Sequence, residues 1–562
     1  MALAAAIPIA SAEDWFVDVA EQRGLRARHY SGASGDWYYP EIMCGGGAWL
    51  DYDNDGDLDF YLVQAHRLPK RTEECPANQL FCNDRGRFTE VPRAGGANDL
   101  GYGNGVACGD YDNDGYVDIY VNNVGPNALY HNNGDGTFTD VTAKAGVGDP
   151  RWCVSSGFLD YDGDGDLDIY VANYVQWSVE TDHPCYGQGG RRDYCGPASY
   201  NLPERHTLYR NNGDGTFTDV TVQAGMGQAR GNGLGVVAGD FNGDDLPDIY
   251  VTNDGSENFL WVNQGDGTFI EDALMMGCAV NELGKTEAGM GVDAADYDDD
   301  GDLDLFMTHL SGETNTFYEF RDGMFEDMTT RLGLAGPSTP YTGMGLGFID
   351  YDNNGLLDIF IGNGRVTYGT VANPAGPFAE PNQLYRLSPD RKYADVSEQA
   401  GSVVTAWDPA HAVAFGDYDN DGDTDIAIVN MDGPVRLLEN RIGDDNAWIG
   451  ISAKGKYGRY ALGAVVTVVT DGAKRNRLVH RAYSYAASND PRLQVGLGNA
   501  SAVKDVIVKW PWGGVEHFGP QKAGRYVQLV EGRGRPGTAV AAPAGEAPTA
   551  SRGHRPREYR DR

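Results

Sequence analysis

Residues 51–59 read DYDNDGDLD, a stretch with five carboxylates and one glycine that runs directly into the apolar segment 60–63. Like charges at this density normally favour a solvated segment, whereas the apolar run is typical of a buried strand. The cluster therefore needs a counter-charge. The same nine-residue frame occurs seven times, at intervals of about 50 to 80 residues, with copies that begin at Asp51, Asp110, Asp160, Asp240, Asp296, Asp350 and Asp417.

The frame places oxygen-bearing side chains at positions 1, 3, 5 and 9 and usually a glycine at position 6. Calcium takes about six to eight oxygen ligands, and the main-chain carbonyl of position 7 can complete such a set, whereas Mg²⁺ demands stricter octahedral geometry. We therefore expect up to seven Ca²⁺ sites. The expected ligand positions are Asp51, Asp53, Asp55, Asp57 and Asp59; Asp110, Asp112, Asp114, Tyr116 and Asp118; Asp160, Asp162, Asp164, Asp166 and Asp168; Asp240, Asn242, Asp244, Leu246 and Asp248; Asp296, Asp298, Asp300, Asp302 and Asp304; Asp350, Asp352, Asn354, Leu356 and Asp358; and Asp417, Asp419, Asp421, Asp423 and Asp425.

Two alternatives to this metal loop can be compared with the frame. An EF-hand would carry a bidentate Glu at position 12, but that position is apolar in every copy, as at Leu62 and Val121. Metal-free Asx-turn loops are the second alternative. Asn242 and Asn354 replace carboxylates and lower the ligand charge of two loops.

The composition agrees with a metal-binding role for much of the acidity. The formal net charge is −38 and the pI is about 4.4, which argues against nucleic acid as a partner. The seven loops hold 32 of the 82 acidic residues. Loops of this kind suit the millimolar free calcium found outside cells.

The chain ends and the cysteines also favour a secreted or periplasmic location. Residues 1–12, MALAAAIPIASA, form a short apolar run with an A-x-A-like cleavage site, so we expect a signal peptide there. No other segment approaches 18 consecutive apolar residues, so no membrane span is expected. Of the eight cysteines, Cys185 and Cys195 form the favoured disulfide and Cys75 with Cys82 a second candidate. Buried free thiols are expected at Cys44, Cys108, Cys153 and Cys278.

Each repeat predicts four strands: one before the acidic loop, one after it, and two that flank a hairpin turn such as NNGDGT at 211–216. Seven such repeats of 50 to 60 residues predict an all-β, seven-bladed β-propeller over residues 13–445. The last repeat lacks its fourth strand, and residues 15–24 match the missing piece, so the N-terminal strand is expected to close the ring. Small residues before each loop, such as Gly46 and Gly105, fit the crowded axis.

At this point the chain resembles a known group of proteins. The loops and blades are similar to FG-GAP/VCBS repeats, the calcium-bearing propeller repeats of integrin α-chains. Residues 446–532 resemble an ASPIC/UnbV domain, the module that follows such propellers in the cartilage acidic protein family; the matching signals include GAV at 463–465, NDPR at 489–492 and WP at 510–511. The run YSYAAS at 483–488 departs from that pattern. The alternating runs of this domain also predict a small antiparallel β-sandwich. Residues 533–562 read as a disordered basic tail.

The resemblance implies extracellular adhesion or binding of a protein or glycan, and no catalytic motif such as G-x-S-x-G or HExxH is present. The leading interpretation is a secreted, calcium-stabilised binding protein. The alternatives are an extracellular enzyme on the propeller, such as a polysaccharide lyase or hydrolase, and a purely structural scaffold.

Two regions are candidates for the ligand site. Five residues beyond each loop, a polar ring is expected at the mouth opposite the calcium loops, made of Gln64, Asn123, Asn173, Asn253, His309, Asn363 and Asn430, although Asn there can also simply start a turn. His309, His411 and Asp293 are the candidates for acid–base work. The second region is the insertion at 174–206, which is rich in aromatic residues (Tyr174, Trp177, Tyr186, Tyr194, Tyr200, with His183).

Overall fold

The computed structural model describes residues 14–69, 76–368, 375–443 and 446–537. The expected signal peptide, Cys75 with its proposed pairing to Cys82, and most of the expected tail lie outside these ranges. The described residues are dominated by β-strands, and the all-β class is confirmed.

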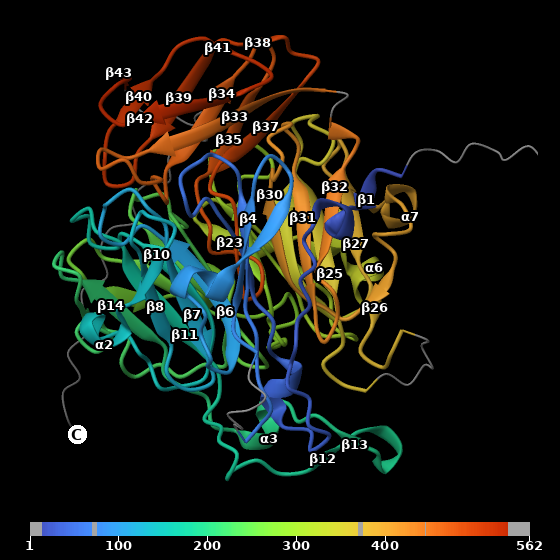
Figure 1. Cartoon of the computed structure of the whole chain (residues 1–562). Helices are drawn as coiled ribbons and strands as arrows, with labels where there is room; N and C mark the ends of the chain where they lie inside the picture. Colours follow the sequence, from blue (N-terminus) through green and yellow to red (C-terminus); the bar gives the residue numbers. More distant parts are fainter. Residues whose placement is uncertain (1–13, 70–75, 369–374, 444–445, 538–562) are drawn as a thin grey trace, which may run out of the picture.

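Among the described residues, seven blades of four antiparallel strands form the larger part of the fold (Figure 1). In the first six blades the strands lie in the order in which they follow along the chain, and in the first blade the short strand β36 (Ala487–Ser488) adds a fifth, parallel strand beside the innermost one. The first three sheets contain β2 (Gly47–Leu50), β3 (Asp59–Leu62), β4 (Gln79–Asn83) and β5 (Phe88–Val91); β6 (Gly103–Gly109), β7 (Asp118–Asn123), β8 (Ala128–Asn132) and β9 (Phe138–Asp140); and β10 (Cys153–Leu159), β11 (Asp168–Asn173), β14 (Thr207–Asn211) and β15 (Phe217–Asp219). The next three contain β16 (Gly233–Gly239), β17 (Asp248–Asn253), β18 (Phe259–Asn263) and β19 (Phe269–Glu271); β20 (Val292–Ala295), β21 (Asp304–Met307), β22 (Thr316–Arg321) and β23 (Met324–Asp327); and β24 (Gly343–Ile349), β25 (Asp358–Asn363), β27 (Gln383–Leu387) and β28 (Tyr393–Asp395).

The seventh sheet joins the two ends of the ring. It contains β30 (Ala410–Gly416), β31 (Asp425–Asn430), β32 (Arg436–Asn440) and, from the start of the chain, β1 (Phe16–Asp18). β1 pairs antiparallel with β32, with Phe16 opposite Asn440, as the sequence predicts. The innermost strands contact one another in succession from β2 to β30, and β30 contacts β2. The sheets are therefore the blades of a closed β-propeller.

The hydrophobic core lies between neighbouring blades rather than at one centre. Between the first and second blades, for example, Tyr61 and Leu80 pack with Val106 and Ile119, and all four are buried. Single-turn helices follow several outer strands: α1 (Ala20–Arg23), α2 (Thr142–Ala145), α4 (Ala273–Met276), α5 (Thr329–Leu332) and α7 (Ser397–Ala400). A further turn, α6 (Ala335–Ser338), comes after α5. The 3-10 turn η2 (Pro92–Gly96) follows β5, and β26 (Glu380–Pro381) pairs with β29 (Trp407–Asp408).

The C-terminal part forms two further sheets that lie on one face of the propeller (Figure 1). One contains β37 (Leu493–Gly498), β33 (Ala447–Lys454) and β42 (Tyr526–Val530); the other contains β35 (Lys474–Leu478), β34 (Val465–Val469), β39 (Asp505–Lys509), β40 (Val515–His517) and β43 (Arg535–Gly537). A third pair is β38 (Ala502–Val503) with β41 (Gln521–Lys522).

Two expectations for this C-terminal part need correction. The sandwich is not wholly antiparallel, because β33 and β42 run parallel. The tail does not begin at residue 533, since β43 pairs with β40 and places His517 opposite Arg535. Backbone hydrogen bonds to an existing sheet edge can order a segment whose composition alone predicts disorder.

Candidate functional site

The seven acidic loops, each the nine-residue frame described above, connect the first and second strands of their blades. In the first loop the Asp51 carboxylate accepts hydrogen bonds from the main-chain nitrogens of Asp55 and Gly56, both at 3.1 Å. Gly56 has a φ of +94°, a conformation that glycine adopts without strain. Carboxylate oxygens of Asp51, Asp53 and Asp59 lie within 4.8 Å of one another. The loop therefore converges several acidic oxygens on one small volume.

The ninth residue of the frame also has a structural task that the sequence pattern does not reveal. The Asp59 carboxylate is fully buried and accepts hydrogen bonds from the main-chain nitrogens of Tyr52 at 2.9 Å and Asn83 at 2.8 Å. It thereby ties the acidic loop to the third strand of its blade. Asp118, Asp168, Asp248, Asp304 and Asp425 make the same two contacts in their own blades.

The electrostatics of the loops call for a positive charge. Burial, with the neighbouring carboxylates of the loop, raises the pKa of Asp51 to about 6 and that of Asp59 to about 9. Among the described residues, the buried oxygens Asp350 Oδ1, Asp358 Oδ2 and Asp419 Oδ1 have no hydrogen-bond partner. A buried, all-oxygen, anionic donor set fits a hard divalent cation, and its size and charge suit calcium.

Basic side chains from the third strand of two blades face the acidic loops of those blades. The sequence analysis did not predict these contacts. His131 Nδ1 lies 3.2 Å from Asp112 Oδ2 and 3.3 Å from Asp118 Oδ1, and these carboxylates, Asp118 above all, raise the pKa of the imidazole. Arg386 likewise contacts Asp352 at 2.7 Å. These residues stand outside the nine-residue frame, so no spacing in the loop itself could identify them.

The C-terminal domain covers the face of the propeller that carries the acidic loops. Asn476 Nδ2 donates to Asp296 Oδ2 at 2.8 Å, and the main-chain nitrogen of Gly496 donates to Asp350 Oδ2 at 3.1 Å. The Tyr526 hydroxyl donates to Asp417 Oδ2 at 2.8 Å. Lys509 Nζ donates to Asp240 Oδ2 at 3.4 Å, so four first-position carboxylates are bonded directly to this domain, and the acidic-loop face is an intramolecular interface.

The seven residues of the expected polar ring share one position at the end of the second strand, but all seven are at most 3 % exposed. Six of the seven carry side-chain amides, which are used inside the protein: Asn123 Nδ2 donates to the Pro126 carbonyl at 3.0 Å, and Asn253 Nδ2 to that of Glu257 at 2.8 Å. Gln64, Asn173, Asn363 and Asn430 make equivalent bonds to main-chain carbonyls. Their burial contradicts an exposed ring and favours the turn-forming role.

The three acid–base candidates do not form one site. Asp293 accepts hydrogen bonds from the main-chain nitrogens of Ala294 and Phe348, and its imidazole partner is His480, at 2.8 Å. His309 and His411 are both buried, and burial lowers the pKa of each to about 4. His309, His411 and Asp293 are therefore not brought together for acid–base work, because each lies in a different set of contacts. His480 belongs to the C-terminal domain and could not be placed from sequence.

Comparison with known proteins identifies the group to which the chain belongs. A family model described as FG-GAP-like repeat matches residues 51–121, 110–171, 190–251, 240–307 and 296–361, more than half of the chain, and one described as ASPIC and UnbV matches residues 454–536. The chain belongs to the FG-GAP repeat family. The resemblance inferred from the sequence is confirmed.

This FG-GAP repeat chain is 27% identical to cartilage acidic protein 1 of Xenopus tropicalis over 53% of its own length and 44% of that protein's. It is 27% identical to cartilage acidic protein 1 of Homo sapiens over 55% of its length and 45% of that protein's. The chain thus spans less than half the length of these relatives. Among solved structures it is similar to an Agrocybe aegerita lectin that recognises non-reducing terminal N-acetylglucosamine (TM-score 0.37, 19% identity, 66% of this chain and 90% of the other) and to BBS1N in complex with ARL6DN (TM-score 0.39, 10% identity, 76% and 98%).

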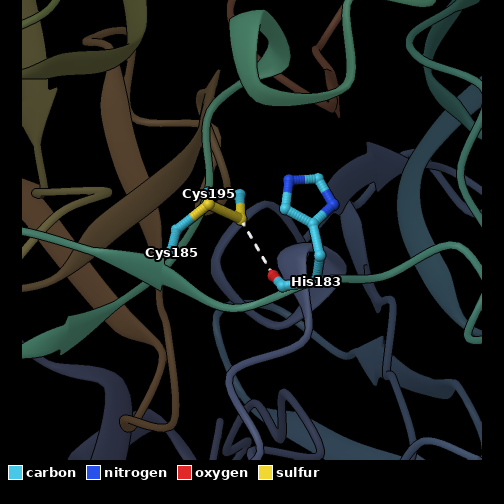
Figure 2. Close-up of side chains that lie close together, drawn as sticks. All are labelled: His183, Cys185 and Cys195. Carbon is cyan, nitrogen blue, oxygen red and sulfur yellow. Dashed lines mark hydrogen bonds between the residues drawn. A yellow bond between two sulfur atoms is a disulfide. The ribbon is translucent and has the colours of Figure 1, made fainter.

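The insertion of this FG-GAP repeat protein lies on the propeller face opposite the C-terminal domain, beside the N-terminal segment (Figure 1). It contains β12 (Cys185–Tyr186), η3 (Gln188–Gly190), β13 (Arg192–Asp193) and α3 (Pro197–Tyr200), and the predicted disulfide joins Cys185 to Cys195 (Figure 2). Because both sulfurs are bonded to each other, His183 and these two cysteines are not a thiolate metal site. Cys44, Cys108, Cys153 and Cys278 are free and buried, as expected.

Aromatic side chains join the insertion to the N-terminal segment and to residues near 368, and we call this assembly the cap (residues 28–45, 174–206, 364–368 and 375–381). Tyr39, in the 3-10 turn η1 (Tyr39–Ile42), stacks on Tyr200 with ring centroids 5.6 Å apart, and its hydroxyl is hydrogen-bonded to that of Tyr174. The Arg191 guanidinium lies 3.2 Å from the centre of the Tyr368 ring. Tyr186 is 65 % exposed.

Proposed function

We propose that the protein is a calcium-stabilised, extracellular binding or adhesion protein that binds a protein or glycan ligand through the cap. The observation that carries this proposal is the occupation of the other face: the acidic loops are covered by the chain's own C-terminal domain, which bonds directly to Asp296, Asp350 and Asp417. The cap is left as the axial surface for a partner. Aromatic and arginine side chains on a disulfide-stapled loop are the residue types enriched at binding sites.

In this proposal the acidic loops hold Ca²⁺ through the carboxylates of positions 1, 3, 5 and 9 and the carbonyl of position 7. The ion supplies charge neutralisation, not catalysis. It would offset the mutual repulsion of buried carboxylates such as Asp51 and Asp59 and leave the loop rigid. Rigid loops in turn hold the blade edges and the C-terminal domain in place.

Two observations support an extracellular location: the curated relatives are cartilage acidic proteins, and the insertion contains a disulfide. No helix among the described residues is long and apolar enough to cross a membrane. Disulfides persist mainly in oxidising compartments, and calcium sites of this type load at extracellular concentrations.

The proposal is tested by presenting the purified, calcium-loaded protein to a glycan array and a panel of extracellular matrix proteins. For any probe bound, the variants Tyr186→Ala and Arg191→Ala should weaken binding several-fold. Tyr457→Ala is the matched control, because Tyr457 is 49 % exposed but belongs to the C-terminal domain on the opposite face. Equal loss in all three variants, or loss in the control alone, would contradict a ligand site on the cap.

The same preparations distinguish binding from the enzymatic alternative. Incubation with acidic and neutral polysaccharides should release no unsaturated or reducing-end products if the protein only binds. Formation of such products by the calcium-loaded protein would identify a lyase or hydrolase. The buried positions of Asp293, His309 and His411 favour binding.

A further inference from the structure

The C-terminal domain sends a segment into the centre of the propeller. Residues 479–492, between β35 and β37, include the short strand β36 (Ala487–Ser488), which pairs parallel with the innermost strand β2 of the first blade. Gly47 lies opposite Ala487 and Ala48 opposite Ser488. Ser484, Tyr485 and Ala486 are all at most 2 % exposed. We call residues 479–492 the axial segment.

Hydrogen bonds fix the axial segment to the inner strands around it. The Ser484 backbone forms a two-way bridge with Val292 of β20, at 2.8 and 3.3 Å, and its hydroxyl donates to the Val413 carbonyl of β30 at 2.9 Å while it accepts from the Leu346 nitrogen of β24. Ala486 N donates to Ser155 Oγ of β10, and Cys108 N of β6 donates to Ser488 Oγ. With β2, these bonds reach the inner strands of six blades.

The small residues before each acidic loop leave room for the axial segment. A Cβ atom on Gly345 would stand 2.8 Å from Ser484 Oγ, and one on Gly105 would stand 3.1 Å from the Ala486 Cα. Both distances are too short for ordinary packing. Glycine at these positions therefore serves the axial segment as well as the crowded blades.

The tip of the axial segment reaches the cap on the far face. Tyr485 stands at the turn between Ser484 and Ala486, whose φ values of +79° and +54° are strained for residues with a Cβ. Its hydroxyl donates to the main-chain carbonyl of Met43 at 2.8 Å, and His411 Nδ1 lies 2.8 Å from the next carbonyl, that of Cys44. Met43 directly follows η1, which carries Tyr39 to the aromatic contacts of the insertion.

We propose that Tyr485 is a positioning residue, through which the C-terminal domain holds the cap in its binding-competent arrangement. The domain thus contacts both faces: its body lies on the acidic loops, and its axial segment is bonded to the main chain beneath the cap. Because a coupling between two sites is reciprocal, a ligand that orders the cap also favours the docked domain. The run YSYAAS, which departs from the family pattern, has its role here. The statement about a ligand rests on the proposed function, whereas the link between Tyr485 and cap order does not.

The test is amide hydrogen exchange of the full-length, calcium-loaded chain, followed by mass spectrometry. Tyr485→Phe removes only the hydroxyl and should speed exchange of the amides at 39–44 and 174–177 by about 5-fold, the effect of one lost buried hydrogen bond. Tyr485→Ala should speed it further. Tyr250→Phe is the matched control, since it removes a buried hydroxyl bond of 2.6 Å to the main-chain carbonyl of Cys278, outside both the cap and the C-terminal domain, and should leave cap exchange unchanged.

The outcomes separate this proposal from the proposed function. Parental exchange at 39–44 and 174–177 in Tyr485→Phe would overturn it, and that variant carries the test if Tyr485→Ala does not fold. Equal acceleration by Tyr250→Phe would also overturn it, because the effect would then reflect general loosening. No ligand is needed in either measurement, so a failed ligand search leaves the result intact.

Discussion

The side-chain amide of Asn132 donates a 2.7 Å hydrogen bond to the main-chain carbonyl of Tyr52, which belongs to the acidic loop of the preceding blade. The Asn132 main-chain nitrogen is bonded at the same time to Asp118 Oδ1, the ninth residue of its own acidic loop. One buried asparagine therefore joins two blades and two acidic loops. Asn83, Asn211, Asn263 and Asn440 make the same bond to the carbonyls of Tyr418, Tyr111, Tyr161 and Tyr351.

Removing this amide should weaken the contact between the first two blades. We expect Asn132→Ala to lower the free energy of unfolding by about 1–3 kcal/mol, because it leaves buried carbonyl groups without their donor. The neighbouring Asn133 is exposed and lies in the hairpin turn, so Asn133→Ala is the matched control and should change stability by less than about 0.5 kcal/mol. Urea unfolding of both variants in calcium gives the comparison. Equal stabilities would show that the blade contact does not depend on the amide.

The same asparagine shows how far the sequence could be interpreted. The NNGDGT pattern correctly predicts a hairpin turn, and Asn132 Oδ1 does accept a bond from Gly134 N at 3.1 Å. Local rules of this kind, repeated seven times, were enough to predict the propeller and the pairing of residues 15–24 with the last blade. The bond to Tyr52 was not predictable, since it depends on how two blades pack.

The axial segment was not predictable from the sequence either, because its conformation also depends on packing between distant parts of the chain. Its residues have neither the alternation of a strand nor the acidic spacing of a loop, and Ser484 and Ala486 adopt positive φ values that their side chains do not indicate. Their conformation is imposed by the surrounding inner strands. The prediction of an exposed polar ring is wrong because six of the seven side chains, such as Asn253, turn their amides inward to a nearby carbonyl, and the seventh, His309, is buried.

Closure of the ring by β1 predicts a large effect from a residue near the start of the chain. Phe16 is fully buried between the sixth and seventh blades, so Phe16→Ala should lower the free energy of unfolding by about 3–5 kcal/mol. Val17→Ala, at a half-buried neighbour on the other side of the strand, should cost much less. Thermal melting in calcium distinguishes the two. Similar melting temperatures for Phe16→Ala and the parent would contradict closure by this strand.

The buried His411 makes stability depend on pH. Burial lowers the pKa of its imidazole to about 4, against an ordinary value near 6.5. As pH falls, the imidazole is therefore protonated in the unfolded chain before it is protonated in the folded protein. The contribution of the neutral His411 to the stability of the folded state is complete above pH 6.5 and is lost as pH falls toward 4. At pH 5 the loss from this group is about 2 kcal/mol.

His411→Asn keeps a donor for the Cys44 carbonyl but does not titrate, so it isolates this contribution. Urea midpoints at pH 7 and pH 5, both in saturating calcium, should fall less in the variant than in the parent. His29 is buried nearby with a pKa also lowered to about 4, and Asp432 acts on both rings, so part of the pH dependence remains. If the variant and the parent lose the same stability between pH 7 and pH 5, folding does not lower the pKa of His411.

Calcium removal should have the largest effect of all. Each occupied site stabilises the folded state by about 2.7 kcal/mol at a hundredfold excess of Ca²⁺ over its dissociation constant, so EGTA should lower the melting temperature strongly. Asp51→Asn should reduce the calcium bound per chain by about one ion, measured by elemental analysis after dialysis. Asp135→Asn, which removes an exposed carboxylate from a hairpin turn, should leave the count unchanged. A melt unaffected by EGTA, with no calcium in the protein, would falsify the metal assignment.

The pH dependence of the chelated protein gives a second sign of the same sites. Without a cation, the folded state holds Asp51 and Asp59 at pKa values of about 6 and 9, above the ordinary 3.8, so it binds protons that the unfolded chain does not. These groups therefore stabilise the EGTA-treated protein at low pH, and that contribution is lost as pH rises through 6 and then 9. With calcium bound the slope should reverse, because protons compete with the ion for the same oxygens. Melting curves at pH 5.5 and 8, with calcium and with EGTA, should cross; parallel curves would mean that the carboxylates and the ion do not share one site.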